Sequence, residues 1–247
     1  MPIFARDDVS IYYEDSAEGS DAEGGGFPLL LIAPGGMRST IPAWAHGPWN
    51  PIEQLGDAYR VIAMDQRNAG RSTAPIRATD GWHVYTEDQL ALMDHLGIER
   101  FHVAGMCIGG PYCMGLAEAA PARVASAVLF QTIGLSDNRE AFFDMFDSWA
   151  DELKADRADV EPHAWESFKQ NMYGGDFLFN VSRDFVAACQ TPVLVLCGKD
   201  LYHPEATSVE IAELAPNAQF IEHWKEPEHQ SAAKSKVAEF LAANTPG

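Results

Sequence analysis

Apolar residues fall along this chain in short uninterrupted runs, and segments with helical periodicity separate them. A continuous run of about four to eight apolar residues is typical of a strand that is buried on both faces of a parallel sheet. The runs that fit this description are 29–33, 59–65, 101–104, 124–130, 191–197 and 219–224. We predict that they form the strands of one sheet.

Helical patterns fill most of the intervals between these runs. The expected helices cover 86–97, 108–120 and 206–214, and a C-terminal helix ends near Phe240 and Leu241. Strands that alternate with helices indicate an α/β fold whose mostly parallel central sheet is flanked by helices.

The N-terminal region has a different pattern. Residues 2–14 read as two short strands around a turn at Asp7 and Asp8, and the acidic, glycine-rich segment 16–26 reads as a surface hairpin or loop.

Residues 135–188 interrupt the alternation. Four aromatic residues between positions 142 and 149 recur at helical spacing, and a second helix is expected over 161–172. Because no strand is expected before Pro192, we interpret 135–188 as a small helical cap inserted into an α/β core of residues 1–134 and 189–247. The aromatic face either packs the cap itself or roofs an apolar pocket.

Length and charge narrow the function. The chain has 247 residues, enough for one full core with an inserted subdomain. Its 17 basic and 36 acidic side chains give a net charge of −19, which argues against nucleic acid and anionic membranes as partners. No apolar run reaches the length of a membrane span. A small-molecule substrate is therefore expected, and the sequence leaves a homodimer open.

The cysteines and histidines predict neither disulfides nor a metal site. Cys107, Cys113, Cys189 and Cys197 form no C-x-x-C pair, and the N-terminus does not resemble a signal peptide. We therefore expect free thiols in a reducing, cytoplasmic setting. The histidines lack metal-ligand spacing, so we expect no metal and no other cofactor.

The stretch Gly105-x-Cys107-x-Gly109 joins an expected strand to an expected helix. A nucleophile at the tip of such a turn sits in strained backbone, and only glycines on both sides leave room for the strand and helix behind it. The start of the helix favours a thiolate and a developing oxyanion. This is the pattern of a nucleophile elbow with cysteine in place of serine. A structural cysteine between packing glycines is the alternative reading.

A second glycine-rich segment, Pro34-Gly35-Gly36-Met37, ends the first long apolar run. Glycines directly after a central strand let backbone N–H groups approach a ligand closely. We expect an oxyanion hole formed by the N–H of Ile108 together with that of Gly36 or Met37, a plain turn being the alternative.

Taken in order, these motifs resemble the α/β-hydrolase fold family over nearly the whole chain. Cys107 follows one strand, Asp200 the penultimate strand and His229 the last, which is the family's order of nucleophile, acid and histidine. The turn from Asp65 to Ser72 resembles the family's D-x-R-G-x-G-x-S turn. The resemblance implies a Cys-His-Asp triad in which His229 accepts the thiol proton and Asp200 orients its ring.

Several positions depart from the family pattern. Pro34 and Glu228 stand where the family usually has histidine and glycine, and the spacing before Asp200 is one residue short. His223 lies at the more usual distance from the C-terminal helix, but its apolar neighbours place it inside the last strand, whereas His229 falls in the following loop. We prefer His229 as the base and keep His223 as the alternative.

The elbow of this chain resembles that of the dienelactone hydrolases, whereas its 65–72 turn and cap resemble the general ester and lactone hydrolases. We expect a cofactor-independent acyl hydrolase that acts on an ester, lactone or thioester through an acyl-enzyme on Cys107. An acyltransferase with the same triad and a non-catalytic ligand-binding homologue are the alternatives.

Overall fold

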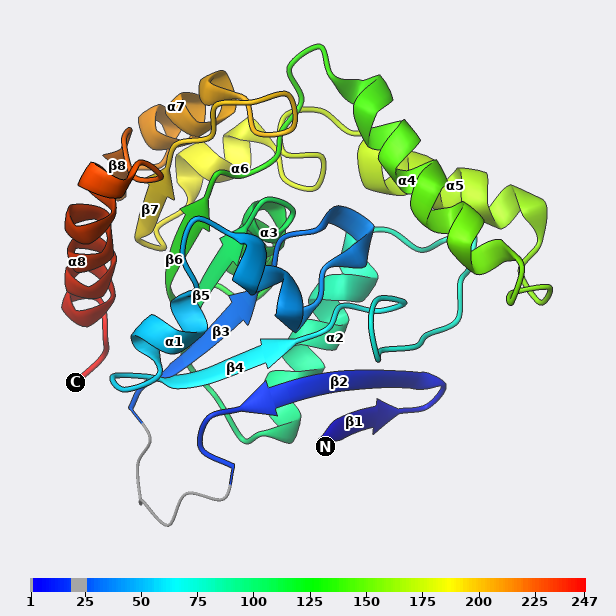
Figure 1. The fold of residues 1–247 in the computed structure, drawn as a ribbon, viewed down its shortest axis with the longest axis horizontal. Helices are drawn as coiled ribbons and strands as arrows, with labels where there is room; N and C mark the ends of the chain where they lie inside the picture. The colour runs from blue at the N-terminus through cyan, green and yellow to red at the C-terminus, as the bar shows by residue number, and fades with distance from the viewer. Residues whose placement is uncertain (1, 19–25) are drawn as a thin grey trace.

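An eight-stranded sheet forms the centre of the computed structural model, which describes residues 2–18 and 26–247 (Figure 1). The strands are β1 (Ile3–Arg6), β2 (Val9–Asp15), β3 (Pro28–Ile32), β4 (Arg60–Met64), β5 (Phe101–Met106), β6 (Val124–Phe130), β7 (Val193–Leu196) and β8 (Ala218–Ile221). They lie in the order β1-β2-β4-β3-β5-β6-β7-β8. Only β1–β2 and β2–β4 pair antiparallel. The predicted mostly parallel sheet is confirmed.

Helices cover both faces of the sheet. They are η1 (Gly36–Arg38), η2 (Ile41–His46), α1 (Pro51–Leu55), α2 (Trp82–His95), α3 (Gly109–Ala119), α4 (Arg139–Lys154), α5 (Pro162–Tyr173), α6 (Arg183–Ala188), α7 (Glu205–Leu214) and α8 (Pro227–Ala243). Leu30 and Ile32 of β3 pack in the same cluster as α2 and α3, and Leu29 and Leu31 pack with α1 and α8. Alternate side chains of one strand thus supply two cores, as expected of a doubly covered sheet.

Three boundaries differ from the sequence-based prediction. Helix α2 begins at Trp82, before the expected cap at Thr86, because the buried Trp82 indole donates to the carbonyl of Met172. Strand β8 ends at Ile221, so His223 lies outside the strand. Helix α8 begins at Pro227, so His229 lies in its first turn and not in a loop. Of the predicted loop over 16–26, residues 19–25 lie outside the described residues.

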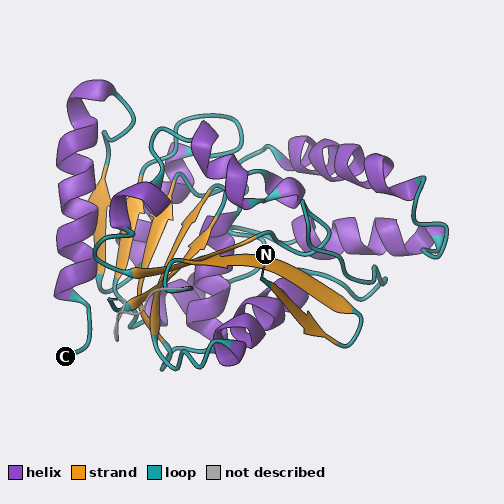
Figure 2. Cartoon of the chain, turned by 60° about the horizontal axis from the view of Figure 1, so that its bottom comes forward, coloured by secondary structure: helices purple, strands orange, loops and turns teal. Residues whose placement is uncertain are grey.

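The segment between β6 and β7 contains α4, α5 and α6. Figure 2 shows α4 and α5 as a pair that extends beyond one end of the sheet. Their facing sides are joined by aromatic contacts, with ring centroids 5.3 Å apart for Phe146 and Phe168 and 6.0 Å apart for Trp149 and Trp165. The aromatic residues of α4 therefore pack this helix pair, and Phe142 at its first turn is left to contact the core beside Cys107.

The turn between Asp65 and Ser72 holds the loop that follows β3. The carboxylate of Asp65 accepts hydrogen bonds from the N–H of Ile41 at 2.8 Å and of Arg71 at 3.0 Å. The hydroxyl of Ser72 donates to the carbonyl of Asp65 at 2.7 Å and accepts from the N–H of Tyr12 at 2.9 Å. This motif is structural: it satisfies buried backbone groups and ties β2, β4 and η2 together.

Strand β5 turns directly into α3 at Cys107, and two glycines make room for the turn. A Cβ on Gly105 would lie 2.5 Å from the carbonyl carbon of Gly109, and one on Gly109 would lie 2.7 Å from the carbonyl oxygen of Ile32. Backbone atoms cannot move aside as a flexible side chain can. The spacing of small residues around Cys107 is therefore a steric requirement of the turn.

Among the described residues, no helix combines the length and apolar character needed to cross a membrane.

The steric argument for the elbow predicts a stability loss. Gly105→Ala is expected to lower the free energy of unfolding by at least about 2 kcal/mol, because the new methyl group overlaps backbone that cannot relax. Gly47→Ala is the control, since its Cβ would make only ordinary contacts, 3.4 Å from the Met106 side chain. Urea unfolding midpoints measure both; equal midpoints would contradict the argument.

Candidate active site

Cys107 occupies the tip of the turn between β5 and α3. It is partly exposed and has a φ of +61°, a conformation that is costly for a residue with a side chain. Its N–H donates to the carbonyl of Phe130 at 3.0 Å, and its carbonyl accepts from the N–H groups of Gly110 and Ile133 at 3.1 and 3.2 Å. Three backbone bonds thus hold the strained residue and present its side chain above the sheet.

Asp200 and His203 lie in one tight turn after β7. Their backbones exchange two hydrogen bonds of 3.2 Å, and Asp200 Oδ1 also accepts the N–H groups of Tyr202 and His203 at 3.1 Å. The ring nitrogen Nδ1 of His203 lies 2.7 and 2.8 Å from the two carboxylate oxygens. The carboxylate therefore fixes Nδ1 as the protonated nitrogen and leaves Nε2 for other chemistry.

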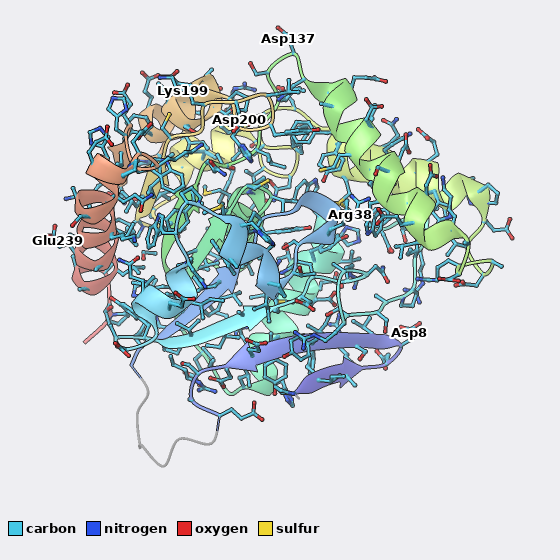
Figure 3. The ribbon with its side chains drawn as sticks, in the orientation of Figure 1. Asp8, Arg38, Asp137, Lys199, Asp200 and Glu239 are labelled. Atoms are coloured by element: carbon cyan, nitrogen blue, oxygen red, sulfur yellow. The ribbon has the colours of Figure 1, made fainter. Side chains whose placement is uncertain are left out.

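Three neighbours hold this turn in place. Gly198 passes so close that a Cβ there would lie 2.6 Å from the Cβ of His203. The hydroxyl of Ser208 accepts the N–H of Gly198 at 3.0 Å, and the side-chain amide of Asn138, at the start of α4, donates to the carbonyl of Leu201 at 2.7 Å. The position of the imidazole is thus set by β7, α7 and α4 together. In Figure 3, Asp200 lies in the loop between β7 and α7.

Electrostatics couples Cys107 to His203. Desolvation raises the pKa of the Cys107 thiol, but the neighbouring His203 ring and the N–H groups of Gly35 and Ile108 outweigh it and bring that pKa below its ordinary value. Desolvation lowers the pKa of His203, but the Cys107 sulfur and the Asp200 carboxylate raise it above its ordinary value. The two shifts have opposite signs and one cause, because each group favours the charged form of the other.

The other nitrogen of this imidazole is poised toward the sulfur. Nε2 of His203 is buried and has no hydrogen-bond partner of ordinary geometry among the described residues. Desolvation raises the pKa of Asp200, but its bonds to His203 and to backbone N–H groups hold it below its usual range. The sulfur of Cys107, the ring of His203 and the carboxylate of Asp200 thus lie in sequence, and each charged form stabilises that of its neighbour.

The predicted oxyanion donors are only partly brought together. Ile108 and Gly36 line the same cavity as Cys107, and Met37 is not among its lining residues. Gly35, which the sequence did not single out, directs its N–H to the sulfur. The φ values of Gly35 and Gly36 are +122° and +58°, so both positions favour glycine. The Gly-Gly pair in the sequence indicated which segment supplies an oxyanion donor, but not which of its N–H groups points toward Cys107.

His229 is not brought to Asp200. Its ring stacks on that of His223, with centroids 5.3 Å apart, and both lie close to the carboxylate of Glu226. The reason is Trp224, which is buried and donates its indole N–H to the carbonyl of Cys197 at 2.8 Å. Trp224 thus anchors the segment between β8 and α8 to the end of β7, and α8 begins three residues later at Pro227.

His203 is the residue that sequence reasoning missed. It was treated only as a histidine without metal-ligand spacing. The available signal was its position three residues after Asp200, in a polar turn that follows a buried strand and ends at Pro204. At that spacing a tight turn can bring acid and imidazole within hydrogen-bond distance of each other.

A cavity of about 240 Å³ adjoins the sulfur. Its lining residues come from the loop after β3, the elbow, the segment after β6, α4 and the turn after β7: Gly35, Gly36, Cys107, Ile108, Ile133, Phe142, Met145, Tyr202 and His203. No group of three or more His, Cys, Asp or Glu side chains within 2–18 and 26–247 is arranged to hold a metal ion. The chemistry available at the cavity is that of a nucleophile, a base and backbone donors.

Comparison with known proteins places this geometry in context. Residues 28–161, more than half of the chain, match the model of the alpha/beta hydrolase fold family. The chain is 28% identical to the 2-hydroxymuconate semialdehyde hydrolase of Pseudomonas sp. (strain CF600), over 89% of this chain and 88% of that protein.

Two solved structures share the fold. The enol-lactonase of Burkholderia xenovorans LB400 is 22% identical, with a TM-score of 0.68 over 98% of this chain and 100% of that one. The serine hydrolase CCSP0084 of Cycloclasticus zankles is 18% identical, with a TM-score of 0.72 over 100% of this chain and 99% of that one.

The pairing of Cys107 with His203 predicts the pH profile of alkylation. Because the pKa of Cys107 is lowered, iodoacetamide is expected to label it rapidly at pH values below the ordinary thiol range of about 8.5. His203→Ala removes the cation and leaves desolvation, so the midpoint of the profile should move upward. His229→Ala is the matched control and should leave the profile unchanged.

Peptide mass spectrometry measures this labelling beside Cys113, Cys189 and Cys197. An upward shift in His229→Ala with none in His203→Ala would restore the base assignment made from the sequence.

Proposed function

Because this chain belongs to the α/β-hydrolase fold family, we propose that it is a hydrolase that cleaves an acyl bond through nucleophilic attack by Cys107. One observation carries the proposal: the Asp200–His203 turn is held against the Cys107 thiol at the edge of an apolar cavity. The similarity to a hydrolase over most of the chain supports the reaction class.

The first half of the reaction uses the ion pair. The Cys107 thiolate attacks the carbonyl carbon of an ester, lactone or thioester and forms a tetrahedral intermediate. The backbone N–H groups of Ile108 and of the Gly35–Gly36 segment stabilise its negative oxygen, and one such donor is typically worth about 3 kcal/mol. The His203 imidazolium gives its Nε2 proton to the departing oxygen or sulfur, leaving a thioester on Cys107.

The second half regenerates the thiolate. Neutral His203 accepts a proton from water through Nε2, and the resulting hydroxide equivalent attacks the thioester carbonyl. The intermediate collapses, the acid product leaves, and the Cys107 sulfur departs as thiolate beside the imidazolium. Asp200 keeps Nδ1 protonated throughout and stabilises the charged ring. No cofactor takes part in this scheme.

Residues 135–188 act in this scheme as the cap proposed from the sequence. Phe142 and Met145 of α4 form the wall of the cavity opposite the elbow. Arg38 of η1 joins the α/β core to this cap, since its guanidinium donates to Glu152 at 2.7 and 2.9 Å and to Ser148 at 3.0 Å. The cap thereby limits the space above the nucleophile.

The proposal predicts an acyl-enzyme on Cys107. A small activated ester, p-nitrophenyl acetate, is expected to release nitrophenol in a burst and to add one acetyl group to the protein by intact mass spectrometry. Cys107→Ala should lose the adduct and at least about 10³-fold in turnover. Cys189→Ala, which replaces a buried cysteine outside the cavity, is the control and should retain both.

Two results would contradict the proposed acyl-enzyme. Full turnover by Cys107→Ala would exclude the cysteine as the nucleophile. A wild-type protein that forms no adduct with activated esters, lactones or thioesters would instead favour a ligand-binding homologue.

A further inference from the structure

The space beside Cys107 limits the size of what it can hold. The cavity measures about 240 Å³. This lies below the range of about 300–1,000 Å³ that is usual for pockets that bury drug-sized ligands, so the space suits a small acyl group. Part of this volume is needed for the carbonyl group that reacts with the sulfur.

Beyond the groups that take part in the reaction, the described residues that line the cavity offer no counter-ion to a charged substrate. Apart from Cys107 and His203, its lining carries only apolar side chains, backbone and the ring of Tyr202. Arg38, which directly follows the oxyanion segment, is held by Glu152 and Ser148 on α4; Figure 3 shows it between η1 and α4. A carboxylate in the cavity would lose its hydration without gaining a counter-ion, which is costly.

Two side chains of α4 line the cavity, and Phe142 is held more firmly in place than Met145. Phe142 contacts the ring of Tyr202 edge-on at 5.5 Å and stacks on Tyr173 at 5.3 Å, so its position is determined by two neighbours. Met145 lies one turn further along α4 and packs directly on Gly36, where a Cβ would be 3.1 Å from its methyl group. Methionine is unbranched and flexible, so its length determines how deep the cavity reaches above the oxyanion segment.

The positions of the reacting groups determine which part of a substrate occupies the cavity. The carbonyl oxygen must face Ile108 and Gly35, and the leaving group must face His203. The turn that carries His203 is exposed, with Leu201 and Tyr202 retaining 61% and 37% of their accessible surface. With the leaving group on the side of this turn, the part of the cavity walled by Phe142 and Met145 is left for the group retained on Cys107.

We propose that this site selects small, uncharged acyl groups and that Met145 sets the size limit. The inference rests on the acyl-enzyme proposed above.

A series of p-nitrophenyl esters tests it, because the leaving group stays constant while the acyl group changes. We expect kcat/KM to rise from acetyl through the short acyl groups, to reach a maximum and to fall for longer chains. An acyl group that ends in a carboxylate should react about 100-fold more slowly than one of equal length that ends in a methyl group.

Met145→Ala tests the assignment of the limiting residue. It should raise kcat/KM about tenfold for acyl groups two or three atoms beyond the wild-type limit, because that much side chain is removed. Leu153→Ala is the matched control: it shortens a partly buried side chain on the same helix that does not line the cavity, and its chain-length profile should match the wild type.

The possible results distinguish a wrong proposed function from a wrong inference about the acyl group. If no ester acylates Cys107, the proposed function is wrong and this inference falls with it. If acylation occurs but the rates are independent of chain length, or favour the carboxylated acyl group, only the inference is wrong. An unchanged profile in Met145→Ala would remove that residue from the size limit.

Discussion

The contact between the Asp200–His203 turn and the Cys107 elbow is the interaction on which the rest of the site depends. Cys107 is held at a φ of +61° by backbone bonds to the segment after β6, and His203 is held by a carboxylate in its own turn. Each alone is an ordinary feature. Together they lower the pKa of the thiol and raise that of the imidazole, because the two charged forms stabilise each other. The α/β scaffold makes this contact possible because the parallel strands β5 and β7 have their C-terminal ends on the same side of the sheet.

Helix α4 completes the site by reaching both loops at once. Its first turn lies beside the base, since Asn138 binds the carbonyl of Leu201 and Phe142 contacts Tyr202. Further along, Met145 packs on the oxyanion segment. A displacement of α4 would therefore change the cavity, the base and the oxyanion donors together. In the proposed scheme, α4 would in this way limit substrate size without contributing a reacting group.

The sequence predicted the scaffold well because the scaffold depends on local patterns. Continuous apolar runs marked the buried strands, and the glycines around Cys107 marked a turn whose steric limits are visible in the sequence alone. The histidine that faces Cys107 could not be predicted in the same way. The assignment of His229 follows the usual chain order, whereas in the structure its ring stacks on His223 beside a segment anchored by the buried Trp224. His203 needed the opposite reasoning, from a three-residue spacing within one turn.

The most direct test of the central claim is a titration of the Cys107 thiolate by its ultraviolet absorbance, as the difference between the wild-type protein and Cys107→Ser. The account predicts that the thiolate signal persists below the ordinary thiol pKa of about 8.5 and that His203→Ala shifts the midpoint upward. A midpoint at or above about 8.5 in the wild type, unchanged by His203→Ala, would contradict it.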